Sequence, residues 1–440
     1  MSALHHVTLL DGLRPGPITD AIGAALHDAG LAGPVHRLAH ERFAPCQGCW
    51  QCWIETPGEC KTHDDANEVM ADTIGSDAVL WTTAPVFGCW DPFTKAALDR
   101  SIGLLSPFFR REDGETHHRR RYHHYPRWGA IAVVDVATPL VEFDLFRRLM
   151  ARNALNFHGG ASWVGFLARD ADPATVRAVV RRGLDALAGG DVVEEPAAVH
   201  VERAPVGVPP RSDRPRHAVL WVGSAKPAGE STSEALGRHL LGRLAARGWT
   251  GEVVHVARTV RLARDEAPGL VAALRRADLV VLATPVYVDA LPSLVLAGLA
   301  RLIGVDWGER PPALLPIVQC GFPELEHTAL AVEVAARAAE RIGLGWAGHL
   351  AMGGGGIIDG APLATLGGRV APQVAALDDA AAALDAGEPV PAAVTAAFGQ
   401  TVMPASMYRL AGNLGWIGAA VQHGSLWRLW DRPFREAGEG

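Results

Sequence analysis

The sequence predicts an α/β protein that contains two open, doubly wound parallel sheets, one in each half of the chain. An internal repeat is the first sign: residues 76–99 (SDAVLWTTAPVFGCWDPFTKAALD) and residues 277–299 (ADLVVLATPVYVDALPSLVLAGL) share an acidic residue, an apolar run, an Ala/Thr-Pro-Val-aromatic loop and a helical pattern. A strand, a loop and a helix are also expected upstream of each copy. Strands that alternate with helices form right-handed βαβ units around a parallel sheet.

The upstream units span residues 6–30 in the first half and 217–248 in the second. Each opens on an apolar run typical of a strand that is buried on both faces. A loop with Gly and Pro follows, and a helical pattern comes next. The repeat therefore predicts the same order of elements in both halves.

The chain has 440 residues, which is too long for one ordinary core and fits two domains. Residues 203–216 (RAPVGVPPRSDRPR) combine Pro and Arg with little packing material, so they are interpreted as a linker with the boundary near Ser212. We expect a first domain at 1–202, a second at 217–390 and a Trp-rich tail at 391–440.

Charge and composition exclude several classes of function. The formal net charge of -7 gives no electrostatic attraction to nucleic acid or to an anionic membrane. The start of the chain lacks the pattern of a signal peptide, and the apolar stretch 414–421 is too short to span a bilayer. We expect a cytoplasmic protein without a transmembrane segment, whose tail covers an apolar surface of its own body or of a partner subunit in a homo-oligomer.

Four of the six cysteines lie within fifteen residues, at Cys46, Cys49, Cys52 and Cys60. Three of them at Cys-x2-Cys-x2-Cys spacing, with the fourth eight residues on, suit a compact polynuclear centre such as a 4Fe–4S cluster. Zinc sites more often separate two Cys-x2-Cys pairs by a dozen residues or more. A loop that keeps its thiols without metal, a dithiol/disulfide pair and zinc remain alternatives. The other two cysteines are expected in the core.

The loop Gly223–Ser233 (GSAKPAGESTS) follows an expected strand and opens an expected helix. Backbone N–H groups, hydroxyl groups, the Lys226 charge and the helix dipole all favour an anion there. The loop is neither a Walker A sequence nor a dinucleotide fingerprint. It therefore predicts a site for a mononucleotide phosphate, although Ser and Thr are also common helix caps.

Three more loops of the second half follow expected strands, where an open α/β sheet forms its ligand crevice. The aromatic Tyr287 follows one strand, Gly321 follows the next, and the run Gly353–Gly356 follows a later one. Glycines allow a backbone to approach a ligand closely. Each loop alone has an ordinary structural explanation, but their recurrence at successive strand ends favours a ligand.

The phosphate loop, the TPVY segment and the cysteine block together resemble the flavodoxin-like NAD(P)H-dependent FMN reductases and, for the cysteines, the iron–sulfur flavoproteins of that superfamily. The resemblance covers nearly the whole chain, as two copies. It implies five-stranded parallel sheets, FMN as cofactor and NAD(P)H as an electron donor. The phosphate contacts that it implies are Ser224, Lys226, Ser231, Thr232 and Ser233, with the flavin ring flanked by Pro285, Val286 and Tyr287. Gly321, Gly353 and Gly354 would border the same cofactor.

The first half departs from this pattern. Its loop Asp11–Pro17 (DGLRPGP) has an acidic residue that repels phosphate and prolines that lack an N–H donor. Yet its segment Thr83–Lys95 resembles the ring loop of the family. We therefore expect FMN mainly in the second half, and a pseudo-dimer of the two halves that places the cysteine loop beside the flavin.

The basic run Thr116–Arg127 (THHRRRYHHYPR) is interpreted as a solvated loop, with a landing surface for NAD(P)H phosphates or for an acidic electron-transfer protein as the sharper hypothesis. Two functions follow from the whole sequence. The first is a flavin-dependent oxidoreductase that passes electrons to or from a small molecule or a redox protein. The alternative is a non-catalytic, flavodoxin-like binding or assembly protein with a vestigial cysteine motif.

Overall fold

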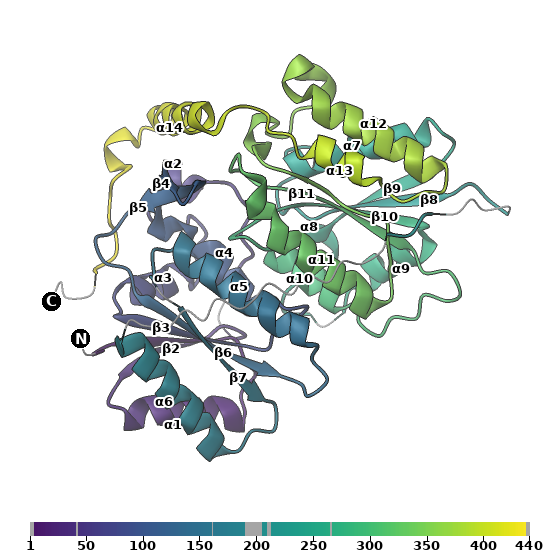
Figure 1. Ribbon diagram of the computed structural model, residues 1–440. Coiled ribbons are helices and arrows are strands. Elements are labelled where there is room, and N and C mark those ends of the chain that lie inside the picture. The colour runs from purple at the N-terminus through teal and green to yellow at the C-terminus, as the bar shows by residue number, and fades with distance from the viewer. Residues whose placement is uncertain are drawn as a thin grey trace. The chain divides into compact units, whose positions relative to one another are not determined.

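The computed structural model describes residues 4–40, 43–160, 162–189, 205–208, 213–264 and 266–436. The chain forms two compact units (Figure 1). Unit 1 comprises residues 1–112, 117–200 and 411–440, and unit 2 comprises residues 113–116 and 201–410. Each unit contains a parallel sheet between two layers of helices, so the predicted α/β class with two doubly wound sheets is confirmed.

The sheet of unit 1 has the strand order β2-β1-β3-β6-β7, and all of its neighbouring strands are parallel. This is the flavodoxin-like order, in which the chain reverses direction across the sheet next to the first strand. The strands are β1 (Val7–Asp11), β2 (Ala32–Arg37), β3 (Ala78–Thr83), β6 (Arg127–Val134) and β7 (Ser162–Ala168).

Helices cover both faces of this sheet (Figure 1). One face carries α1 (Pro17–Asp28) and α6 (Pro173–Gly189), which contact each other. The other face carries α3 (Ala66–Ile74), α4 (Pro92–Arg100) and α5 (Leu140–Asn156). The strands β1 and β3 are buried along their whole length, as their near-continuous apolar sequences predict.

The sheet of unit 2 repeats the same order, β9-β8-β10-β11, followed at the edge by two short strands, β12 and β13, that both pair with β11. The fifth strand of the fold is thus divided in two. The strands are β8 (His217–Val222), β9 (Thr250–His255), β10 (Leu279–Pro285), β11 (Ala313–Gln319), β12 (Gly345–Trp346) and β13 (Leu350–Met352).

The helices of unit 2 also form two layers (Figure 1). One layer contains α7 (Thr232–Ala245), α12 (Ala371–Asp385) and α13 (Ala392–Phe398), which pack on the sheet through a shared apolar core. The other contains α8 (Val256–Thr259), α9 (Pro268–Arg276), α10 (Ser293–Ala300) and α11 (Ala329–Ile342). No helix among the described residues is long and apolar enough to cross a bilayer.

The basic run is not the solvated loop that its charge predicts. Strands β4 (Leu105–Glu112) and β5 (Glu115–Arg120) pair as a two-stranded sheet, and the run begins in β5. Arg121 is buried, and its guanidinium donates to the backbone carbonyls of Gly103 (2.9 Å) and Asp431 (2.7 Å). These hydrogen bonds offset part of the cost of burying the charge, and charge patterning alone does not reveal them.

The linker segment contributes to the core of unit 2. Val208 is buried there, and the Val206 N–H donates to the Trp346 carbonyl (2.6 Å). The predicted boundary at Ser212 lies outside the described residues. In the tail, α13 packs on unit 2 through Phe398, and α14 (Ala405–Gln422) follows it.

Candidate functional sites

The loop between β8 and α7 lies at the carboxyl end of the parallel strands. Its first N–H, that of Gly223, donates to the Ala283 carbonyl of β10 (2.7 Å). A Cβ atom on Gly223 would lie 2.8 Å from both Thr284 and Val295, so only glycine allows this close approach. The loop therefore starts between β8 and β10, the point at which flavodoxin-like sheets hold their ligand.

The predicted phosphate residues surround the N-terminus of α7. Ser224, Ser231, Thr232 and Ser233 are all buried. Ser231 is the N-cap, and its hydroxyl oxygen accepts from the Glu234 N–H (3.1 Å). The N–H groups of Thr232 and Ser233, the first two of the helix, have no acceptor within it, as in any first turn.

The other three hydroxyl groups also contact protein atoms, and that of Ser224 accepts from the Lys226 N–H (3.3 Å). Thr232 donates its hydroxyl hydrogen to the Gly355 carbonyl (2.9 Å), and Ser233 accepts from the Gln319 side-chain amide (3.3 Å). A hydroxyl has one hydrogen to donate. Thr232 must therefore break its bond to Gly355 before it can donate to an anion.

A protein carboxylate already occupies part of the loop. Glu234 is buried, and its carboxylate accepts from the Gly229 N–H (2.7 Å) and from Arg238 (2.7 Å) and lies 3.2 Å from His255 Nε2. Burial raises the pKa of Glu234, but these hydrogen bonds lower it by more, so the pKa lies below its ordinary value. The charge of Lys226, which is 3.9 Å from Asp359, remains at the open side of the loop.

The predicted ring loop forms a tight turn after β10. The Tyr287 N–H donates to Ala290 (2.9 Å) and the Ala290 N–H returns to Tyr287 (3.2 Å), while Val288 and Asp289 have φ values of 50° and 57°. Two consecutive positive φ values are typical of a type I′ turn. A β-branched residue such as Val288 rarely adopts this conformation, which is characteristic of strained functional loops. Val286 and Tyr287 are partly exposed beside this turn.

Unit 1 has the same turn after β3. Val86 and Cys89 exchange backbone hydrogen bonds (2.8 and 3.0 Å), and the two residues between them, Phe87 and Gly88, have φ values of 57° and 72°. The sequence repeat thus extends to an unusual backbone conformation at the same place in each sheet.

The glycine run after β13 packs closely against protein. The Gly354 N–H donates to Phe322 (2.6 Å) and the Gly355 N–H donates to Cys320 (2.8 Å). A Cβ atom on Gly353 would lie 2.4 Å from the Pro323 carbonyl oxygen. The close backbone approach is therefore made to the loop after β11, while Gly321 has open space around it. Contact of these glycines with a ligand stays a prediction.

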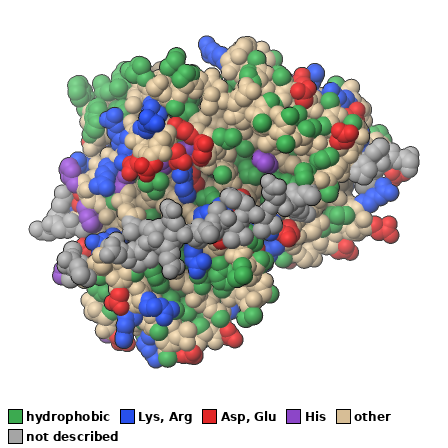
Figure 2. Space-filling model, in the orientation of Figure 1, with side chains coloured by type: hydrophobic (Ala, Val, Ile, Leu, Met, Phe, Trp, Pro, Cys, Tyr) green, Lys and Arg blue, Asp and Glu red, His purple; other side chains and the backbone are tan. Residues whose placement is uncertain are grey.

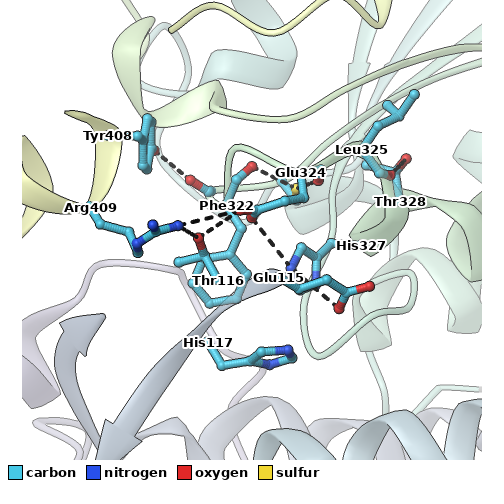
Figure 3. A network of polar contacts seen from close by, with 12 residues as sticks. Glu115, Thr116, His117, Phe322, Glu324, Leu325, His327, Thr328, Tyr408 and Arg409 are labelled. Carbon is cyan, nitrogen blue, oxygen red and sulfur yellow. Dashed lines mark hydrogen bonds and ion pairs between the residues drawn. The ribbon is translucent and has the colours of Figure 1, made fainter. Parts of the chain in front are cut away.

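A polar network that the sequence did not indicate lies in the loop after β11 (Figure 3). Glu324 accepts from the Thr116 hydroxyl (2.8 Å) and lies 3.8 Å from Arg409. His327 is buried, and its Nδ1 lies 3.2 Å from an Asp289 carboxylate oxygen. Because Asp289 belongs to the tight turn after β10, this pair joins the loops after β10 and β11.

The corresponding first loop of unit 1 is filled by a carboxylate. Asp11 is buried at the end of β1, where it accepts from Thr82 (2.5 Å), Leu13 N–H (3.1 Å) and Arg37 (2.9 Å). Burial raises the pKa of Asp11 more than these contacts lower it. A negative group inside this loop disfavours phosphate, as the sequence predicts.

The four clustered cysteines lie around the short helix α2 (Gln51–Ile54) in unit 1, with Cys52 inside the helix. Cys52 is buried, Cys49 is exposed, and the other two are intermediate. Burial raises the pKa of the Cys46 thiol to about 12. Burial also raises the pKa of Cys52, and thiolates at Cys46, Cys60 and Cys49 would raise it further.

Two buried arginines surround these thiols. Arg100 donates to Asp64 (2.8 Å). Burial lowers the pKa of Arg100, but the bond to Asp64 and the neighbouring Cys60 and Cys46 raise it above its ordinary value. Arg121 lowers the pKa of Cys52. The Nη2 atom of Arg121 is buried and has no hydrogen-bond partner within the described ranges. These charges suit an anionic centre, because they offset the repulsion among thiolates.

Aromatic rings cover the cysteine loop. Trp50 and Trp53 stack at a ring-centroid distance of 5.0 Å, and Trp416 packs edge-on against Trp53 at 5.2 Å. The Trp53 indole donates to Leu105 (3.0 Å). Asn67 holds the backbone of Cys60 through two hydrogen bonds (2.8 and 3.0 Å). The remaining cysteines, Cys89 and Cys320, are buried as expected for core residues.

No protein-family model and no curated protein matches this chain. Among solved structures, an azoreductase from Bacillus anthracis is 12% identical with a TM-score of 0.28, and the match covers 39% of this chain and 98% of that one. An NAD(P)H:quinone oxidoreductase from Methanothermobacter marburgensis is 14% identical with a TM-score of 0.26, over 32% and 84%. RosB is 17% identical with a TM-score of 0.27, and the match spans 31% of this chain and 64% of RosB. These matches are too distant to support any inference about this chain, so the fold assignment rests on the strand order.

Proposed function

We propose that this chain is a flavin-dependent oxidoreductase that binds FMN in unit 2 and exchanges electrons with NAD(P)H or with a redox partner. The observation that carries the proposal is the N-terminus of α7. Buried hydroxyl groups, free first-turn N–H groups and one lysine meet there, beside β8 and β10. Such a helix end attracts a phosphate group, and the β8/β10 position is where flavodoxin-like sheets take FMN.

The donors that remain in this loop fit a phosphate monoester. Ser231 acts only as an acceptor toward Glu234, so its hydroxyl hydrogen is available. The N–H groups of Thr232 and Ser233 and the Lys226 ammonium add further donors. Arg238 balances the charge of Glu234, which holds Gly229 in place without leaving a net negative charge.

The ring of the cofactor would be bordered by Pro285, Val286 and Tyr287. The type I′ turn fixes the direction of this segment, because both of its central residues are locked at positive φ. The Asp289–His327 pair ties the turn to the loop after β11. FMN, when bound, supplies hydride and single-electron chemistry, while these residues bind and orient it.

We further propose that Cys46, Cys49, Cys52 and Cys60 hold a 4Fe–4S cluster in unit 1. Four thiolates are the ligand count of such a cluster, and Arg100 and Arg121 place positive charge beside them. Trp50, Trp53 and Trp416 would limit the access of water, which tunes the reduction potential. Electron transfer between this loop and the flavin stays a prediction.

The experiment is anaerobic purification followed by absorption spectroscopy and titration with NADH and, separately, NADPH. We expect flavin bands that bleach with one or both donors, and a broad iron–sulfur absorption with matching iron and sulfide content. A protein that binds FMN but is reduced by neither nicotinamide nor by a reduced ferredoxin or flavodoxin would support the non-catalytic binding function instead. A protein that binds no flavin would refute the proposal.

A further inference from the structure

Helix α14 presents a regular apolar stripe to solvent. Its large apolar side chains follow each other at alternating spacings of three and four residues. Their exposed fractions reach 59% at Met407, 63% at Leu410 and 60% at Leu414. The members of the stripe are Met407, Leu410, Leu414, Ile417 and Val421. Figure 2 shows hydrophobic side chains gathered over this helix.

The opposite face of α14 packs against the protein, so the stripe is not the face that the helix uses for its own packing. The Asn413 side chain accepts from the Phe109 N–H (2.8 Å). Trp416 packs against Trp53, and Ala420 is fully buried in a small apolar cluster with Phe108. One face of α14 therefore packs on the protein, and no element among the described residues covers the stripe on the other face.

We propose that the α14 stripe is the interface through which two copies of this chain associate. The three-four alternation places the apolar side chains on one face, as in a helix that packs along a second helix. A helix on a bilayer surface has the same period, so charge and apolar area decide between the two. Ala411, Gly415 and Gly418 lie beside the stripe and leave room for the side chains of a facing helix. The helix therefore presents large side chains and, beside them, the space to accept the side chains of a facing helix.

Charge favours a second copy over the other occupants. The only charged residue of α14 is Arg409, which lies 3.8 Å from Glu324, so two such faces can meet without like-charge repulsion. Arg428 beyond the helix is paired with Asp431 (3.0 Å). A helix that binds a membrane surface instead carries unpaired Lys and Arg residues along its polar side.

The size of the apolar surface suits a dimer. Trp427 and Trp430, in the segment that follows α14, are also exposed, at 87% and 59%. Together with the five stripe residues they expose roughly 800 Å², about what one partner contributes to a standard interface. A single-chain protein rarely leaves a patch of this size uncovered.

The test is analytical ultracentrifugation of the full chain over a range of concentrations, with Leu414→Glu as the test variant. Leu140→Glu is the matched control, because Leu140 is a leucine of α5 that is 84% exposed. We expect a dimer for wild type and for L140E, and self-association weakened at least ~100-fold in L414E. Because Leu414 is exposed, circular dichroism should be unchanged.

A monomeric wild type, or an L414E variant that dimerises like wild type, would overturn the proposal. Flotation with phosphatidylcholine vesicles covers the main alternative. A monomeric wild type that floats with the vesicles, while L414E does not, would assign the stripe to a membrane surface. FMN content reports on the α7 loop and is expected to be equal in all three proteins, so this test is independent of the proposed function.

Discussion

A pair of substitutions at Ser231 tests the phosphate site without removing the helix cap. Ser231 accepts from the Glu234 N–H at the start of α7, and Asp and Asn cap helices about as well as Ser. Ser231→Asp and Ser231→Asn have the same size and differ in charge. The cap is preserved in both, so a difference in FMN affinity between them reports charge at the proposed phosphate position.

The magnitude follows from the position of the cap. An Asp carboxylate that holds the same N–H would lie about 4 Å from an anion on the neighbouring N–H groups, and two unit charges at that distance repel by about 4 kcal/mol near a protein surface. Allowing for screening, we expect about 2–4 kcal/mol, or roughly 30- to 1,000-fold weaker FMN binding in S231D than in S231N. Fluorescence titration of apoprotein with FMN measures this ratio, and urea unfolding checks that the two variants are equally stable. Equal FMN affinities in two folded variants would refute the phosphate assignment.

Three further substitutions, two of them with a matched control, test other parts of the structure. Glu234→Gln should lower the free energy of unfolding by about 1.5–3 kcal/mol at pH 7. Because the folded pKa of Glu234 is depressed, this difference should vanish as the pH falls below 4.5 and through the folded pKa. Urea unfolding of both proteins at several pH values measures it. Cys52→Ser should remove iron but not flavin, measured by iron analysis, while Cys320→Ser should remove neither. Gly353→Ala should cost about 2 kcal/mol in thermal unfolding because its Cβ would meet a backbone carbonyl, whereas Gly368→Ala, with open space, should be neutral.

The sheets were predictable from sequence because their strands are nearly continuous apolar runs. The runs at 78–83 and 279–285 are buried along their whole length, and each is followed by a capped or Pro-initiated helix. The two sheets therefore follow from local patterns that recur about 200 residues apart. The division of the last strand of unit 2 into β12 and β13 has no such signal, since each piece has only two or three residues.

The interior of the sites was less predictable, because it depends on contacts between distant residues. Glu234 reads as an ordinary first-turn acid, yet its carboxylate folds back to Gly229 and His255. The sequence also gives no sign that Phe87 and Val288 adopt positive φ, since these residue types avoid it. Arg121 reads as one charge in a solvated run, but carbonyls more than 300 residues away accept its hydrogen bonds.

The stoichiometry of bound FMN distinguishes one flavin site in unit 2 from a flavin site in each unit. Protein purified in the presence of excess FMN and then desalted is denatured, and the released flavin is identified and quantified by chromatography against the protein concentration. Within the part of the chain that the structure describes, the loop 223–233 presents hydroxyl groups and first-turn N–H groups, whereas Asp11 fills the corresponding loop of unit 1. We therefore predict one FMN per chain. A ratio near two, or flavin that is retained in full when Lys226 and Ser231 are both replaced by Asp, would contradict it.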